Sequence, residues 1–98
     1  MKWILQPQEK KGTYQFNGLF LATQGVFEQL SLDEINAIYS VIKEKVRAEG
    51  GLDYLQVFQH ADTAQKLFFI DQLNKEMIEH GGFDVKDDHC TLLFPHEY

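Results

Sequence analysis

The strongest constraint on the fold is a helix signal that begins at Ser31. Ser31 is a preferred N-cap residue, and Glu34, three positions later, completes a capping box. Gly50-Gly51 supplies the left-handed conformation that commonly ends helices. Between these signals, apolar residues recur at spacings of three and four and form one stripe: Ile35, Ile38, Tyr39, Ile42 and Val46. We therefore predict one main amphipathic helix over about residues 32–49.

The segments that flank this helix have strand-like patterns. Leu19-Phe20-Leu21-Ala22-Thr23 is a short apolar run that is typical of a strand. Asn17-Gly18 is a turn signal, and it predicts a hairpin between this run and Tyr14-Gln15-Phe16. After the helix, residues 52–59 are rich in aromatic and β-branched residues, which predicts a central strand.

Residues 62–80 have two interpretations. Lys66-Leu67-Phe68-Phe69-Ile70-Asp71 is apolar on both faces, as a buried strand is. Asp62 or Thr63 has the character of an N-cap, from which a second helix would instead run to the Gly81-Gly82 stop. We expect a strand at 66–72 and a second short helix over about 73–80, with the longer helix as the alternative.

The C-terminal region again has a strand-like pattern. Residues 83–86 and 89–94 flank Asp87-Asp88, which indicates a tight turn between two strands. Pro95 cannot donate to a sheet ladder, so the last strand should end there or lie at an edge. Strands on both sides of one helix predict an α+β fold, in which the helix packs on one face of a mostly antiparallel sheet. With 98 residues, we expect a single domain over 1–98.

The cysteine content and the N-terminus bear on the compartment. Cys90 is the single cysteine, so no internal disulfide forms, and this favours a reducing environment. The apolar start Trp3-Ile4-Leu5 is too short for the hydrophobic region of a signal peptide. No stretch approaches the ~20 apolar residues of a membrane helix. We therefore expect a small cytoplasmic protein with no membrane partner.

The net charge of −6 is unevenly distributed along the chain. Residues 1–50 carry six acids and six bases, whereas residues 51–98 carry nine acids and three bases. Direct binding of DNA or RNA relies on Lys and Arg, and Arg47 is the single arginine, so we expect no direct nucleic-acid partner. The acidic half is either a solvated surface that keeps the protein soluble or a face for a basic partner.

Three segments, taken in order, are similar to a known family. They are Gly18-Leu-Phe-Leu-Ala-Thr-Gln-Gly-Val-Phe-Glu-Gln-Leu-Ser-Leu32, Leu52-Asp-Tyr-Leu-Gln-Val-Phe-Gln59 and Val85-Lys-Asp-Asp-His-Cys-Thr-Leu-Leu-Phe-Pro-His-Glu-Tyr98. Across residues 18–59 and 85–98 the chain resembles the small proteins of Gram-positive bacteria grouped as the domain of unknown function 960 family. The resemblance implies a cytoplasmic α+β fold and a link to accessory genes of phages or plasmids. It implies no activity, because the family has no assigned one.

Chemistry-bearing side chains gather at residues 87–90. Zinc sites use Cys and His as spaced pairs, whereas His89 and Cys90 are adjacent and point to opposite faces of a strand. We therefore expect no metal and no cofactor, and Cys90 as a small buried hydrophobe. An enzyme that uses Cys90 as nucleophile with His89 remains the least favoured alternative.

The end of the chain carries aromatic and acidic groups that suit protein binding. The other interpretation is that Phe94 covers the core while Tyr98 is loose. The candidate surface comprises Asp84, Asp87, Asp88, His89, Phe94, His96, Glu97 and Tyr98. The leading hypothesis is a non-catalytic binding or regulatory module with a protein partner, an accessory protein of a phage or plasmid. The alternative is an acidic DNA mimic that inhibits a nucleic-acid-binding protein. The sequence leaves homodimer formation open.

Overall fold

The computed structural model of the chain describes residues 1–73, 75–82 and 88–98. Its strands are β1 (Trp3–Leu5), β2 (Leu19–Ala22), β3 (Leu55–His60), β4 (Lys66–Asp71) and β5 (His89–Leu93). Its helices are α1 (Gln24–Gln29), α2 (Leu32–Glu49) and α3 (Lys75–His80), followed by a 3₁₀ turn, η2 (Pro95–Glu97). The predicted α+β fold, with a main helix at 32–49 and a second short helix, is confirmed.

Helix α2 begins and ends at the residues that its local signals predict. The Ser31 hydroxyl accepts the backbone N–H of Glu34 at 3.1 Å, and the Glu34 carboxylate accepts the backbone N–H of Ser31 at 3.0 Å. Gly50 ends the helix with a φ of 78°, a left-handed conformation that glycine adopts without a steric penalty. The capping box therefore satisfies two backbone groups that the first turn leaves unpaired.

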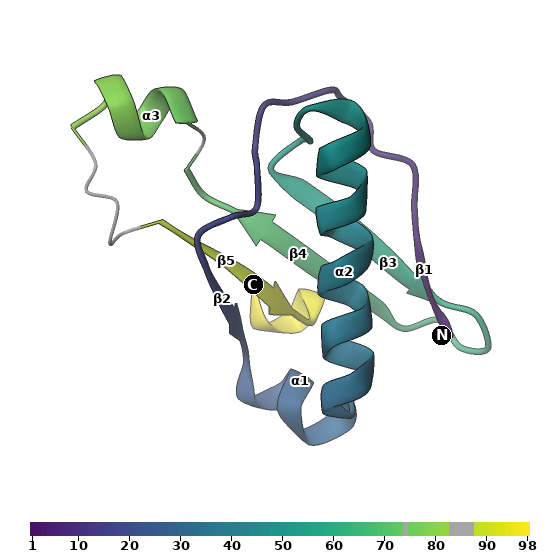
Figure 1. The fold of residues 1–98 in the computed structure, drawn as a ribbon. Coiled ribbons are helices and arrows are strands. Elements are labelled where there is room, and N and C mark those ends of the chain that lie inside the picture. The colour runs from purple at the N-terminus through teal and green to yellow at the C-terminus, as the bar shows by residue number, and fades with distance from the viewer. Residues whose placement is uncertain (74, 83–87) are drawn as a thin grey trace.

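The sheet has five strands in the order β1-β3-β4-β5-β2. Three of the four pairings are antiparallel, and β2 pairs in parallel with β5. Figure 1 shows that α2 crosses one face of this sheet. Strands β1 and β2 form the two edges. The closing strand β5 ends before Pro95, as predicted, but it lies inside the sheet between β4 and β2.

The core fills the space between α2 and the sheet. Each strand turns alternate side chains toward the helix, because successive residues of a strand point to opposite faces. Phe58 of β3, Phe69 of β4 and Ile38 and Ile42 of α2 are fully buried there. Burial of each such side chain stabilises the fold by about 1.5–3 kcal/mol. The predicted apolar stripe of the helix is thus the face that packs on the sheet.

The predicted hairpin of residues 14–16 with residues 19–23 is wrong. Tyr14 forms only an isolated bridge with Leu52, and β2 pairs with β5. The backbone at Phe16 has a φ of 50°, which interrupts an extended strand. Its N–H donates to the Asp71 carboxylate at 2.9 Å instead of to a neighbouring strand. A long-range polar contact therefore replaces the local turn that Asn17-Gly18 suggested.

Other expectations have mixed outcomes. The alternative of one long helix across 62–80 is wrong, because residues 66–71 form β4 between β3 and β5. The turn at Asp87 and the strand-like residues 83–86 lie outside the described residues. The sequence patterns did not predict β1 or α1.

Within the described part of the chain, no helix combines the length and the apolar character needed to cross a membrane.

The N-cap of α2 gives the first testable prediction. Ser31→Ala removes one half of the capping box and should lower the free energy of unfolding by about 1 kcal/mol. Urea unfolding followed by circular dichroism measures this change. Ser40→Ala, on an exposed position of the same helix, is the matched control and should leave stability unchanged or slightly raised. Equal stabilities of the two variants would contradict the role assigned to the cap.

Candidate functional site

The face of the sheet opposite α2 is only partly covered. We call it the open face, and strand alternation together with the strand register assigns the residues to it. Its apolar members are Ile4, Leu19, Leu21, Leu55, Val57, Phe68, Ile70 and Leu93. Leu19 and Leu21 on β2 are 66% and 40% exposed, and Val57 and Phe68 at the centre are half-buried. Apolar surface of this kind is characteristic of interaction sites.

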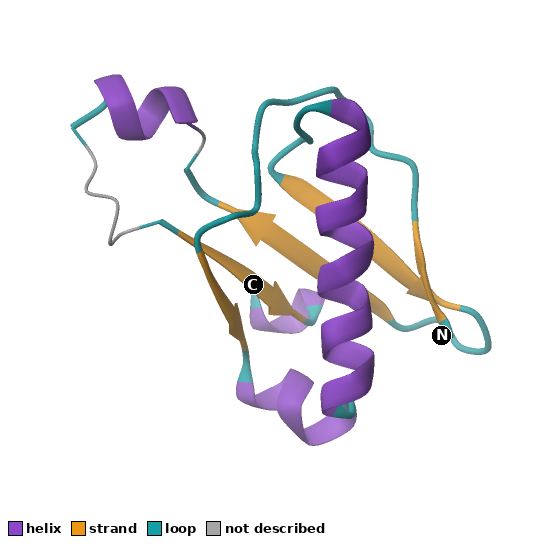
Figure 2. Cartoon of the chain, in the orientation of Figure 1, coloured by secondary structure: helices purple, strands orange, loops and turns teal. Residues whose placement is uncertain are grey.

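The C-terminal turn η2 packs against part of this face (Figure 2). The ring of Tyr98 meets the ring of Phe68 edge to face, with centroids 6.2 Å apart. The Glu97 carboxylate accepts the Phe94 N–H at 2.9 Å and the Thr23 hydroxyl at 2.8 Å. These two hydrogen bonds lower the pKa of Glu97. The turn is therefore tied to the N-cap of α1, and the position of Tyr98 follows from it.

A groove of about 390 Å³ lies between this turn and the sheet. Its lining combines apolar side chains of β4 and β5 with polar groups at the rim: Ile70, Gln72, Thr91, Leu93, Glu97 and Tyr98. Tyr98 is 74% exposed, so the groove has an aromatic wall that is accessible to a partner. An amphipathic aromatic residue beside an apolar groove is typical of protein-binding sites.

The structure divides the eight candidate residues of the sequence analysis into separate places. His96, Glu97 and Tyr98 meet at the C-terminal turn, where the His96 ring stacks on Phe94 at 5.8 Å and Phe94 is itself buried. Asp88 and His89 lie at the opposite end of β5, about 16 Å away at the usual rise of a strand. Asp88 is buried, and His89 is half-buried. Asp84 and Asp87 lie outside the described residues.

Sequence reasoning missed the open face itself. The sequence pattern of β4 indicates apolar residues on both faces, but it does not show whether a second layer covers the face opposite α2. The available signal was the number of long helices, because the sequence predicts only one that spans a sheet. A single such helix leaves the other face of the sheet open.

A buried polar cluster lies on the helix side of the sheet. Asp71 is 1% exposed, and one of its oxygens accepts the Phe16 N–H. The Lys43 amine of α2 donates to the backbone carbonyls of Gln15 and Phe16 at 3.3 and 3.2 Å. The other carboxylate oxygen of Asp71 and one of Asp88 are buried without a hydrogen bond. The cluster therefore fixes residues 15–16 across the sheet while it keeps two acids close together.

This environment determines the protonation of Asp71 and Cys90. Burial raises the pKa of Asp71 to about 6, and the nearby Asp88 acts in the same direction, whereas the Phe16 hydrogen bond and Lys43 oppose the rise. Burial also raises the pKa of the Cys90 thiol to about 12, with a further contribution from Asp71 and Asp88. A fully buried, protonated thiol is a poor nucleophile, so the environment opposes a catalytic role for Cys90.

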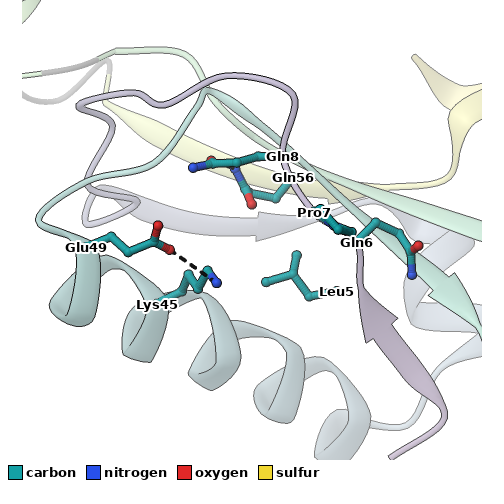
Figure 3. Close-up of a pocket in the computed structure, with 7 residues that line it drawn as sticks. All are labelled: Leu5, Gln6, Pro7, Gln8, Lys45, Glu49 and Gln56. Carbon is teal, nitrogen blue, oxygen red and sulfur yellow. Dashed lines mark hydrogen bonds and ion pairs between the residues drawn. The ribbon is translucent and has the colours of Figure 1, made fainter.

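A second pocket lies on the helix side of the sheet. This pocket has a volume of about 330 Å³ and lies between the end of β1 and α2. Figure 3 shows the Lys45–Glu49 ion pair on its helix side. At its base the Gln56 amide donates to Gln8 at 3.0 Å, and the Gln8 oxygen also accepts the Asp53 N–H at 2.9 Å. This network supports the loop after β1. The described residues contain no group of His, Cys, Asp and Glu that could hold a metal ion.

The buried carboxylate gives a pH prediction. Asp71 has a pKa of about 6 in the folded protein and 3.8 as its ordinary value. Between these two pH values the folded state keeps a proton on Asp71 that the unfolded state has lost. This contribution to stability is fully present below pH 3.8 and is lost as the pH rises through 6. Asp71→Asn carries no charge and keeps an acceptor for Phe16, so its stability at pH 7 should match or exceed that of the original protein. The gain is at most about 3 kcal/mol.

Urea unfolding at pH 5 and pH 7 measures this effect. The original protein should lose more stability between the two pH values than Asp71→Asn does. Asp33→Asn, which changes an exposed aspartate in the first turn of α2, should keep the loss of the original protein. The assignment to Asp71 is wrong if Asp71→Asn and Asp33→Asn show the same pH dependence.

No family model, curated protein or solved structure matches this chain. The resemblance to the domain of unknown function 960 family therefore stays a prediction.

Proposed function

We propose that the protein is a non-catalytic protein-binding module whose binding site is the open face together with the C-terminal turn. The observation that carries this proposal is that α2 covers one sheet face, while the other face carries exposed Leu19 and Leu21 and half-buried Val57 and Phe68. A groove lies on the same face, beside the C-terminal turn. Sheets in stable folds bury their apolar faces against a second layer. A partner supplies the second layer that the described residues do not provide on this face.

The chemistry of the site defines the partner. The centre of the open face is apolar, with Val57 and Phe68 opposite each other in the register of β3 and β4. Glu97 lies at the groove, and the chain carries a net charge of −6. The complementary partner is a protein segment, such as an amphipathic helix, with an apolar stripe and basic flanking residues. A regulatory role for a phage, a plasmid or their bacterial host is part of the same proposal.

The alternative of an acidic DNA mimic gains no support from four of the described acids of the C-terminal half, Asp62, Asp71, Asp88 and Glu97. A DNA mimic presents exposed carboxylates in the place of phosphates. Asp71 and Asp88 are buried, Asp62 forms an ion pair with Lys2, and Glu97 binds Thr23 and Phe94. These acids therefore do not combine into one exposed acidic surface.

Affinity capture from a bacterial extract, with mass spectrometry of the bound proteins, tests the proposal. Val57→Lys places a charge at the centre of the open face, and Tyr98→Ala removes the aromatic wall of the groove. Both variants should lose a protein that the original chain retains. Ser40→Lys adds the same charge on an exposed position of α2 and should retain it. Circular dichroism confirms that each variant is folded.

The salt dependence separates the two functions. Capture through the open face should persist at high salt, because burial of apolar surface drives it. Capture that falls steeply as the salt concentration rises, and that Val57→Lys and Tyr98→Ala leave intact, would support the acidic mimic and overturn the open-face proposal.

A further inference from the structure

The two edges of the sheet differ in how they are protected. Edge strands expose unpaired backbone groups, and proteins usually guard them with short strands, proline or charge. β1 has only three residues, is followed by Pro7 and is preceded by Lys2, which pairs with Asp62. β2 reads Leu19-Phe20-Leu21-Ala22 and contains no charged residue and no proline. β2 is thus the unguarded edge.

Among the described residues, none is found to bind the backbone groups on the outer side of β2. On the inner side, the Leu19 N–H donates to the Asp88 carbonyl, just before β5, and the Thr23 N–H donates to the Leu92 carbonyl of β5, both at 3.1 Å. Because hydrogen-bonding groups alternate along a strand, those of Phe20 and Ala22 point away from β5. In Figure 1 no described element lies beyond this edge, and α1 turns from the end of β2 toward α2.

A charge-free run surrounds this edge. Residues 12–27, from Gly12 to Phe27, contain no charged residue, although 24% of the whole chain is charged. Leu19, Leu21 and Phe27 within this run are exposed apolar side chains. Two molecules that each carry a net charge of −6 repel each other generally, but at this edge they can meet without opposing like charges. A strongly charged partner would find no complementary charge there.

We propose that β2 pairs antiparallel with β2 of a second copy of this chain and joins the two sheets across a twofold axis. In this register Phe20 lies opposite Ala22 of the other copy, and these residues exchange the backbone hydrogen bonds that each edge leaves free. Leu21 meets its own copy at the axis as a close, non-hydrogen-bonded pair on the open face. The outward backbone groups of Phe20 and Ala22 are two residues apart on both copies. Each strand therefore presents the spacing that the other requires, and the interface is self-complementary.

The paired interface is small, so we expect a weak dimer with a dissociation constant on the order of micromolar. Added salt should leave it unchanged or strengthen it, because salt screens the repulsion between two acidic chains. Sedimentation equilibrium over a range of protein and salt concentrations measures both properties. Hydrogen exchange should show that the amides of Phe20 and Ala22 become protected as the protein concentration rises.

Two variants test the edge. Leu21→Lys places a charge beside its own copy at the axis and should shift the protein to monomer. Ala22→Pro removes an outward N–H that the sheet does not use, and edge strands tolerate proline at such positions. Ile4→Lys makes the same type of change on the other edge strand, where Ile4 is 53% exposed, and should leave the dimer intact. Circular dichroism checks the fold of each variant, and Leu21→Lys keeps the test decisive should Ala22→Pro fail to fold.

A monomer at all concentrations overturns the inference, as does a dimer that Ile4→Lys breaks and Leu21→Lys leaves intact. The inference goes beyond the proposed binding function, and the two can fail separately. A monomeric Ala22→Pro variant that still captures the partner supports both the edge pairing and the open face. A dimer that captures no partner supports only the pairing.

Discussion

The packing of α2 on one face of the sheet is the interaction on which the rest of the molecule depends. Ile38 and Ile42 of the helix and Phe58 and Phe69 of the sheet have no exposed surface and belong to the hydrophobic core cluster. The described part of the chain has no second helix of comparable length, since α1 and α3 have six residues each. With one long helix in the described part of the chain, the core forms on the helix side of the sheet and the other face stays open.

A second set of contacts decides how the chain before α2 reaches the sheet. The Asp71 carboxylate of β4 and the Lys43 amine of α2 both bind the backbone at residues 15–16. Gly18 then passes so close to Asp88 that a Cβ atom would lie 2.5 Å from its carbonyl oxygen. β2 consequently runs beside β5 in parallel and becomes an edge. This arrangement buries a carboxylate, Asp71, whose pKa is raised. The buried charge lowers the stability of the protein at neutral pH.

The sequence predicted those parts of the fold whose causes are local. The cap, stripe and glycine stop of α2 lie within twenty residues, and the structure reproduces them. The apolar run at residues 66–71 predicts β4, and the sequence also predicts the short helix that comes after it. The hairpin before β2 failed because its competitor, the bond from Phe16 to Asp71, joins residues 55 positions apart. Likewise, the pattern Phe68-Phe69-Ile70 shows that both faces of β4 are apolar but not what covers each one.

The candidate site shows the same division. Tyr98 could be singled out as an aromatic residue at the end of the chain, but its place on the open face depends on Glu97, which binds Thr23 across 74 positions of sequence. The open face and the unguarded β2 edge meet at Leu21, which belongs to both. Pairing of two β2 strands would therefore make the two open faces continuous and place both grooves on the same side of one sheet. A partner with two binding segments could then engage both copies at once, and a weak dimer would gain avidity without any new contact.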